Sequence, residues 1–501
     1  MTRRVSEAMR KLGRGAAIGN VQDFFPQILT GGDPLGDFFI KSISAGDRRI
    51  HGATFTPPWM IDLQLDQIAA KCTPLRVVDA GAGTGRYAVR AAQRWPRAEV
   101  IAVERDPVLA EAIVINAKAI GLRLKVVCAD FLSINLPRID GVTAFVGNPP
   151  YIRHHDISSE DKKWYSNQMR KIGLPHSQLA GLHIYFYLKS YLLSRPGDVG
   201  SFVTAAEWTE TNYGESMRTL FCIMGGDKLI RIHPRERIFP DALTTSIIAN
   251  WSKASDGDVN VCDLIGRSVE TQFQARREQL RTLTKWPGFG HSLPSMVKSK
   301  ISLLGDFFKV SRGQVTGCNE LWIASKETEK LIPERYLFPC VTDAMEIIEC
   351  EGVLNDLSKL RRVIDLPVNL NELTRSEREQ VDSFLAIGRF IGATDSYIAQ
   401  HRKPWWRVGL KPSPPIIMSY MGRRPPRFAR NACGARLLNI AHGLMPRRAM
   451  SISEQDKIVQ WLNRNVAITN GRMYGGGMIK FEPGDAMNIP FPPLNHLFSA
   501  A

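Results

Sequence analysis

The sequence predicts an α/β fold in which a doubly wound parallel β-sheet is covered by helices on both faces. Between residues 50 and 255, short apolar runs alternate with stretches of helical pattern, as in parallel sheets built from repeated strand–helix units. The first of these runs, residues 75–79, leads directly into a turn with glycines at positions 81, 83 and 85. A glycine turn between a buried strand and a helix is typical of the first crossover of a doubly wound sheet.

The individual elements follow from the same pattern along the chain. Four strands are predicted from their apolar runs: 75–79, 100–104, 124–128 and 143–147. A helix is predicted over 87–94, before Pro96. A second helix is predicted from the Asp106-Pro107 pair to Gly121, since proline fits the first turn of a helix.

Changes in composition divide the chain into four parts. Residues 1–45 contain the turn-rich segment GGDPLGD and are predicted to be an irregular lead-in. The strand–helix alternation defines a domain over 46–255, and the charged, weakly patterned residues 256–300 are predicted to be a linker. From 301 to 501, short mixed segments broken by Gly and Pro predict a second domain of α+β character.

The composition narrows the expected partners and compartment. The 501 residues carry a formal net charge of +16, which favours a polyanionic partner over a basic surface without such a role. The eight cysteines form no CxxC pair and no zinc spacing with histidine, so we expect reduced thiols and no metal site. The sequence has no apolar run of membrane-spanning length and no signal-peptide core, so we expect a cytoplasmic chain without a membrane partner.

The glycine turn and two acidic strand ends predict a ligand that contains a nucleoside. Glycines let the chain turn tightly and bring its backbone close to a ligand. Glu104 ends the second strand, where an acid can bind ribose hydroxyls. Asp130 and Phe131 follow the third strand, where an acid and an aromatic ring can hold a purine. The spacing is GxGxG rather than the GxGxxG of dinucleotide sites, and a plain tight turn is the alternative interpretation.

Asn148-Pro149-Pro150-Tyr151 follows the fourth predicted strand and indicates a site for an exocyclic amino group. The prolines stiffen the segment and remove backbone donors, which leaves the Asn148 side-chain carbonyl and nearby backbone carbonyls as acceptors. Acceptors for both amino protons draw the nitrogen lone pair out of conjugation, so that the nitrogen can attack directly without a cysteine nucleophile. Tyr151 offers an aromatic face to a planar base. A structural proline-rich turn is the alternative.

Together these motifs resemble those of the gamma-type amino-group (N6-adenine) DNA methyltransferases of restriction-modification systems, such as TaqI and Eco57I. In that family a Thr-Pro motif precedes the glycine turn, and Phe55-Thr56-Pro57-Pro58 matches it. The segments 182–186 (LHIYF) and 237–240 (RIFP) match two later motifs. The resemblance implies a class I, Rossmann-like methyltransferase that uses S-adenosyl-L-methionine (AdoMet). Such an enzyme flips adenine out of a specific DNA sequence and methylates its N6 by direct in-line displacement.

The resemblance also implies a role for each motif residue. The catalytic segment is Asn148, Pro149, Pro150 and Tyr151, and Phe239 is expected to stack on the flipped base opposite Tyr151. The glycine turn would line the methionine end of the cofactor, and Glu104 would bind the ribose. Asp130 and Phe131 would hold the adenine, with the aliphatic stem of Arg105 covering the ring. The expected cofactor contacts are Thr56, Asp79, Gly81, Gly83, Gly85, Glu104, Arg105, Asp130, Phe131 and Phe186.

Residues 301–501 resemble the specificity region of the same family, so we expect them to form the DNA target-recognition domain. No acidic residue occurs from 396 to 453. This pattern suits phosphate contacts and base-edge reading, although a solvated basic face would look the same. Four aromatic residues are interleaved: Trp405, Trp406, Tyr420 and Phe428. The expected DNA contacts are Arg402, Lys403, Arg407, Arg423, Arg424, Arg427, Arg430 and Arg436.

The expected partners are double-stranded DNA and a separately encoded cognate restriction endonuclease, with the enzyme acting as a monomer on DNA. An N4-cytosine DNA methyltransferase is the nearest alternative, because cytosine also presents an exocyclic amino group. The NPPY motif also occurs in enzymes that methylate RNA or protein glutamine. A restriction enzyme that also cuts DNA would need a nuclease domain, for which we expect the roughly 45 residues before the first motif to be too few.

Overall fold

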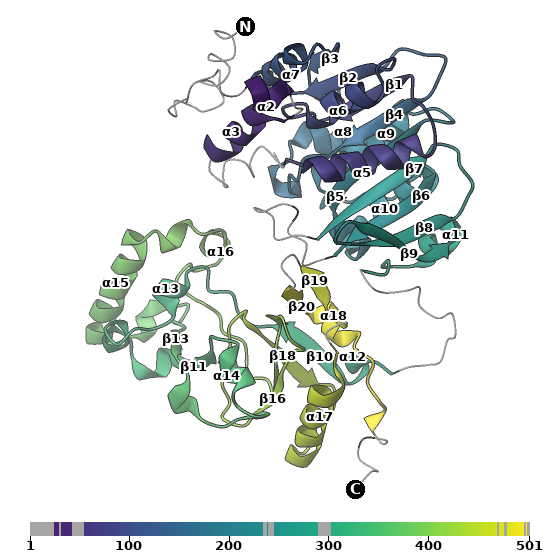
Figure 1. The fold of residues 1–501 in the computed structure, drawn as a ribbon. Helices are drawn as coiled ribbons and strands as arrows, with labels where there is room; N and C mark the ends of the chain where they lie inside the picture. The colour runs from purple at the N-terminus through teal and green to yellow at the C-terminus, as the bar shows by residue number, and fades with distance from the viewer. Residues whose placement is uncertain are drawn as a thin grey trace. The chain divides into compact units, whose positions relative to one another are not determined.

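The structure, a computed structural model, describes residues 25–29, 32–42, 55–233, 238, 245–288, 302–467, 470–474, 478–494 and 497. They belong to two compact units, Met1–Ser295 and Met296–Ala501. Figure 1 shows the first unit, coloured purple to teal, as a sheet between helices. The second unit, green to yellow, mixes short strands and helices.

The first unit is built on a sheet that has nine strands among the described residues. In spatial order these are β3 (Lys125–Cys128), β2 (Glu99–Glu104), β1 (Arg76–Ala80), β4 (Thr143–Gly147), β5 (Val199–Ala205), β7 (Ser246–Ser252), β6 (Gly226–Ile232), β8 (Val259–Ile265) and β9 (Ser268–Ala275). From β3 to β5 the neighbouring strands are parallel, whereas β7 is antiparallel to β5 and β6. The strand order reverses between β1 and β4, which places a crevice at their carboxyl ends.

Helices cover both faces of this sheet, as the alternating side chains of a buried strand require. One face carries α5 (Pro58–Ala69), α6 (Arg86–Arg94) and α7 (Pro107–Ala119), and the other α8 (Ser159–Lys171), α9 (Leu182–Leu193) and α10 (Glu215–Ile223). In β1, Val77 packs into the core under α5 and α6, and its neighbour Val78 packs into the core under α9. The predicted doubly wound α/β fold is confirmed.

The predicted elements up to β4 agree closely with the observed ones, because their signals are local. All five residues of β1 and all five of β4 are buried, which explains the apolar runs 77–78 and 144–146 within them. Helix α7 begins where the Asp-Pro pair predicts: the Asp106 carboxylate accepts from the backbone N–H of Val108 over 2.8 Å, and Pro107 occupies the first helical position.

Two parts of the predicted domain division are wrong. Within the proposed linker 256–300, strands β8 and β9 extend the sheet and α11 (Arg277–Thr282) follows them. Strand β9 is a polar edge strand, so no apolar run in its sequence indicates that it pairs with β8. Within the proposed irregular lead-in 1–45, the structure contains helices α2 (Phe25–Leu29) and α3 (Pro34–Ser42). The described part of this unit also contains the short 3-10 helices η2 (His154–Asp156), η3 (Ala206–Thr209) and η4 (Asn212–Gly214).

The second unit is an α+β assembly, with three small sheets among its described residues. The largest has the order β10 (Phe308–Arg312), β18 (Ala441–Pro446), β14 (Ile416–Ser419), β16 (Phe428–Asn431) and β12 (Val353–Leu354). The others are β13 (Arg362–Ile364), β11 (Leu337–Val341) and β17 (Arg436–Leu437), and β15 (Met421–Gly422), β20 (Met478–Lys480) and β19 (Arg472–Tyr474). The mixed character matches the predicted class of this domain.

Two longer helices of this unit, α15 (Arg375–Phe390) and α17 (Ile452–Asn465), begin with capping boxes at Thr374/Glu377 and Ser451/Glu454. The short helices are α12 (Leu304–Phe307), α13 (Asn319–Trp322), α14 (Met345–Ile348), α16 (Tyr397–Gln400), α18 (Pro483–Met487), η5 (Thr328–Leu331), η6 (Glu334–Tyr336), η7 (Leu357–Lys359), η8 (Leu370–Glu372) and η9 (Ala393–Asp395). Throughout the part of the chain described in both units, no helix is long and apolar enough to cross a membrane.

Candidate active site

The glycine turn and the NPPY segment lie side by side because β1 and β4 are neighbouring parallel strands. Their register pairs Asp79 with Val146, so both motifs leave the sheet at the same carboxyl edge. Gly147 has φ of +150°, and a Cβ there would lie 2.9 Å from the carbonyl oxygen of Ala80. The close approach of the two backbones therefore depends on glycine at this position.

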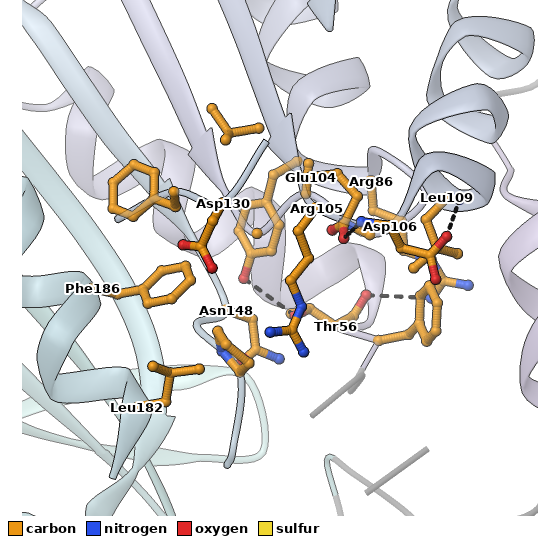
Figure 2. A pocket seen from close by; sticks show the side chains of 18 of the residues that line it. Thr56, Arg86, Glu104, Arg105, Asp106, Leu109, Asp130, Asn148, Leu182 and Phe186 are labelled. Carbon is orange, nitrogen blue, oxygen red and sulfur yellow. Dashed lines mark hydrogen bonds between the residues drawn. The ribbon is translucent and has the colours of Figure 1, made fainter. Parts of the chain in front are cut away.

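A pocket opens at this edge and collects most of the predicted cofactor residues. Of these, Thr56, Gly81, Gly83, Glu104, Arg105, Asp130, Phe131 and Phe186 line it, together with Asn148 and Pro150 of the NPPY segment. In Figure 2, Asn148 and Phe186 lie on one side of the view, Asp106 and Leu109 lie on the other, and Glu104 lies between them. Segments far apart in sequence thus form the walls of one pocket.

Glu104 ties the glycine turn to the start of α7. Its Oε2 accepts from the backbone N–H of Gly83 over 2.8 Å, and its Oε1 accepts from that of Asp106 over 2.9 Å. The side chain is 8% exposed, and burial raises the pKa of its carboxyl above the ordinary value. Glu104 therefore helps to shape the turn as well as lining the pocket.

Asp79 and Gly85 do not line the pocket and instead support it from behind. The Asp79 carboxylate is fully buried, and its Oδ2 accepts from the backbone N–H of Ala88 in α6 over 2.9 Å. Burial raises the pKa of this carboxyl to about 8, and the nearby Glu104 carboxylate adds to the shift. Gly85 has φ of +89°, and a Cβ there would lie 2.9 Å from Ile113 Cγ2. Gly85 therefore lets α6 begin directly against α7.

The far wall of the pocket is aromatic and acidic. The rings of Phe131 and Phe186 stack with centroids 5.0 Å apart and an angle of 27°. The Asp130 carboxylate lies beside them, half-buried, and its Oδ1 accepts from the backbone N–H of Leu132 over 2.8 Å. An acid next to aromatic rings is the arrangement that the sequence predicts for holding a purine.

The Thr-Pro motif is held by a buried polar network that the sequence interpretation missed. The Tyr87 hydroxyl donates to Gln64 Oε1 and shares a second hydrogen bond, 3.3 Å long, with the Thr56 hydroxyl. Gln64, fully buried in α5, donates through Nε2 to the carbonyl oxygens of Gly147 at 3.5 Å and Ser201 at 3.0 Å. One glutamine thus connects the Thr-Pro motif to the strand end that carries Asn148. A single buried Gln within a helix has no distinguishing signal in the sequence.

The NPPY residues are divided between the pocket and its support. Asn148 and Pro150 line the pocket, whereas Pro149 is buried and Tyr151 lies outside the lining. Burial raises the pKa of the Tyr151 hydroxyl, and the nearby Ser246 side chain at the start of β7 partly opposes this shift. The tyrosine hydroxyl is therefore directed toward the sheet. Phe239, its expected partner across the target base, lies outside the described residues.

Comparison with known proteins assigns both units to one family. Residues 77–160 match the model "Methyltransferase domain", 130–234 "Eco57I restriction-modification methylase", and 293–500 "Type II methyltransferase M.Eco57I, C-terminal domain". The type II methyltransferase M.XamI of Xanthomonas campestris pv. amaranthicola is 41% identical over 456 residues, or 89% of this chain and 86% of the relative. The chain belongs to the type II restriction-modification DNA methyltransferases.

More distant relatives extend the likeness. The type II methyltransferase M.AccI of Acinetobacter calcoaceticus is 25% identical over 485 residues, or 89% of this chain and 86% of the relative. A solved structure of the type IIL restriction-modification enzyme MmeI in complex with DNA superposes with a TM-score of 0.57 at 12% identity. It covers 91% of this chain and 70% of that chain, and it shows a shared fold.

In this methyltransferase, the basic residues predicted to contact DNA form two groups. Lys403, Arg407, Arg423, Arg424 and Arg427 are exposed. The guanidinium groups of the other three are engaged within the domain, which argues against their predicted role. Arg402 donates to the Val315 carbonyl over 2.7 Å, Arg430 pairs with Asp456 at 2.6 Å, and Arg436 donates to the Leu410 carbonyl over 3.1 Å.

Three of the interleaved aromatic residues also serve the domain core. Trp405 packs edge-on against Trp322 at a centroid distance of 6.1 Å, and the Trp406 indole N–H donates to the Pro367 carbonyl over 3.1 Å. Phe428 is 1% exposed in β16. Base-edge contact by these rings is therefore not supported, and the exposed cations are the stronger candidates for DNA contact.

Proposed function

We propose that this methyltransferase transfers a methyl group from AdoMet to N6 of adenine in duplex DNA. One observation carries the proposal: Asn148 and Pro150 line the same pocket as Gly81, Gly83 and Glu104. A segment rich in hydrogen-bond acceptors and a cofactor-type glycine turn thus share one pocket at the switch point of the sheet. This arrangement suits group transfer between two molecules that meet there.

The described residues fit AdoMet as the methyl donor. Gly81 has φ of +73°, and a Cβ there would fill a cradle 3.4 Å from Phe186 Cε1 and 3.8 Å from Pro150 Cδ. Glu104 and Asp130 offer carboxylates to ribose and adenine, with Phe131 beside them. Under the turn, a positive charge on the cofactor would favour the ionised form of Asp79. When bound, AdoMet supplies an electrophilic methyl group on a sulfonium.

Asn148 would act on the amino group of the target base. Its side-chain carbonyl accepts one amino proton, and a nearby backbone carbonyl of the NPPY segment accepts the other. These two hydrogen bonds orient the amino nitrogen toward the cofactor. Because both N–H bonds point at acceptors, electron density is localised on the nitrogen and its lone pair becomes available. The amino nitrogen gains one methyl group and gives up one proton in the net reaction.

The target adenine must leave the DNA double helix, because its N6 lies inside a stacked and paired duplex. Extrusion costs a few kcal/mol, and we propose Tyr151 and Phe239 as the rings that offset it by stacking. Since the Tyr151 hydroxyl is buried near Ser246, only the face of its ring would meet the base. A 2-aminopurine at the target position is expected to brighten on binding, and Tyr151→Ala is expected to change that signal and slow methylation. Unchanged fluorescence and rate in Tyr151→Ala and Phe239→Ala would remove both rings from the base pocket.

The product distinguishes the proposed reaction from its alternatives. Duplex DNA methylated by the purified enzyme should yield N6-methyladenine when its nucleosides are separated by mass spectrometry. N4-methylcytosine as the sole product would assign the enzyme to the other amino-group class. Methylation of RNA or of a release-factor glutamine in place of DNA would overturn the proposed substrate. A separate cognate endonuclease and monomeric action on DNA stay predictions.

A further inference from the structure

Helix α3, in the N-terminal segment, contributes to the wall of the cofactor pocket. Phe39 of α3 is 6% exposed and lines the pocket. Its ring packs edge-on against Phe55 at a centroid distance of 5.9 Å. A Cβ at Gly83 would lie 3.8 Å from the Phe55 ring, which places this aromatic pair beside the glycine turn. Phe39 matches none of the motifs that define the family resemblance.

Asp33 holds α3 against the glycine turn and the two helices beside it. Its carboxylate accepts from the Thr84 hydroxyl, from Arg86 Nε over 2.7 Å and from Asn116 Nδ2 over 3.1 Å. The same carboxylate caps α3 by accepting from the Gly36 backbone N–H over 2.9 Å. The Asp33 side chain is 10% exposed, so these bonds are shielded from water.

The contact between α3 and the turn leaves no space for a larger residue at Gly36. A Cβ there would lie 2.0 Å from Asp33 Oδ2 and 2.7 Å from Thr84 Oγ1. Arg86 in turn extends over the Phe55 ring, with its guanidinium carbon 4.9 Å from the centroid. One carboxylate thus connects α3 to α6, to α7 and, through Arg86, to the aromatic pair.

We propose that α3 is part of the cofactor site, with Phe39 touching bound AdoMet and Asp33 acting as the positioning residue that holds α3 on the glycine turn. The inference rests on the proposed function, since it assumes that AdoMet occupies this pocket. Because Phe39 lines the pocket, removing its side chain should speed AdoMet dissociation more than it affects DNA binding. Asp33 acts through the position of Phe39, so its loss should have the same signature.

The test measures AdoMet affinity by calorimetry and AdoMet dissociation by stopped flow in the full chain. Phe39→Ala and Asp33→Asn are each expected to raise the Kd for AdoMet about tenfold, mainly through faster dissociation. DNA affinity should stay near that of the unsubstituted enzyme, and Phe39→Leu should recover part of the affinity for AdoMet. The cofactor-free Tm is expected to fall, because Phe39→Ala leaves a cavity and Asp33→Asn weakens a shielded ion pair, so AdoMet binding is compared at a temperature at which every variant is folded. Gly36→Ala should weaken AdoMet binding too, although alanine favours the helix itself.

Asp37→Asn is the matched control. Asp37 also pairs with Arg86, at 2.6 Å, but it is 60% exposed. We expect its Kd for AdoMet to stay within about twofold of the unsubstituted value. If Phe39→Ala and Asp33→Asn bind and release AdoMet as the unsubstituted enzyme does, the inference is overturned and the proposed function stands. If the unsubstituted enzyme does not bind AdoMet, the proposed function fails and this inference fails with it.

Discussion

Replacing Asn148 with alanine is expected to slow methyl transfer by about 10²-fold or more while AdoMet affinity stays within a few-fold, the scale of losing one group aimed at a transition state. The structure separates the two functions because Asn148 belongs to the segment after β4, whereas the glycine turn is held by Glu104 and Asp79. Removing the Asn148 amide deletes an acceptor and leaves those bonds intact. Single-turnover rates and calorimetry on the same preparation would measure both quantities.

Glu104→Gln gives the opposite pattern and serves as the control for this prediction. An amide nitrogen cannot accept from the backbone N–H groups of Gly83 and Asp106 as both carboxylate oxygens do, so the turn should loosen. We expect weaker AdoMet binding, with less effect on the rate at saturating cofactor. If Asn148→Ala lost AdoMet binding together with activity, the role assigned to Asn148 would be wrong.

The combined substitution of Arg423, Arg424 and Arg427 by alanine is expected to weaken DNA binding by about one to two orders of magnitude near physiological salt. The three residues are exposed on the short connection between β15 and β16, which also contains Pro425 and Pro426. If each neutralises one phosphate, the slope of log K against log salt should fall by about 2.7 in magnitude. Fluorescence anisotropy at several salt concentrations measures affinity and slope together.

Two single variants separate phosphate contact from loss of positive charge. Arg375→Ala removes a charge that is 96% exposed on α15, outside the acid-free stretch, and should leave the slope unchanged. Arg430→Ala breaks the ion pair with Asp456 and should lower stability more than DNA affinity. A triple variant with unchanged affinity and slope would exclude the connection between β15 and β16 from the DNA interface.

The contrast between Arg430 and Arg423 shows why charge patterns only partly predict a binding surface. No acidic residue occurs from 396 to 453. Arg430 nevertheless forms an ion pair with Asp456, just beyond that stretch. The half-buried Arg402 lies near Asp365, whose negative charge favours the charged form of the guanidinium. Folding brings acids from elsewhere in the chain to some of the arginines and leaves others exposed. The sequence identifies a basic region, but only tertiary contacts show which of its cations are available.

The order of strands and helices up to β4, the glycine turn and the NPPY segment can be predicted from the sequence alone, because these signals are local. Buried parallel strands are rich in apolar residues, and a tight turn beside a ligand favours glycine. Which motif residues line the pocket and which support it became clear only from the folded structure. It also showed that the polar edge strand β9 extends the sheet and that Phe39 of α3 lines the pocket.

The Asp33-Pro34 pair is a helix start of the same kind as Asp106-Pro107, so the sequence contains a local signal for α3. The position at which α3 packs cannot be predicted in this way, because Asp33 contacts Arg86 and Asn116, which lie 53 and 83 residues away in the sequence. A local pattern determines that a helix forms, since caps and turns involve neighbouring residues. Where the helix packs is decided by buried partners that are adjacent only in the folded protein.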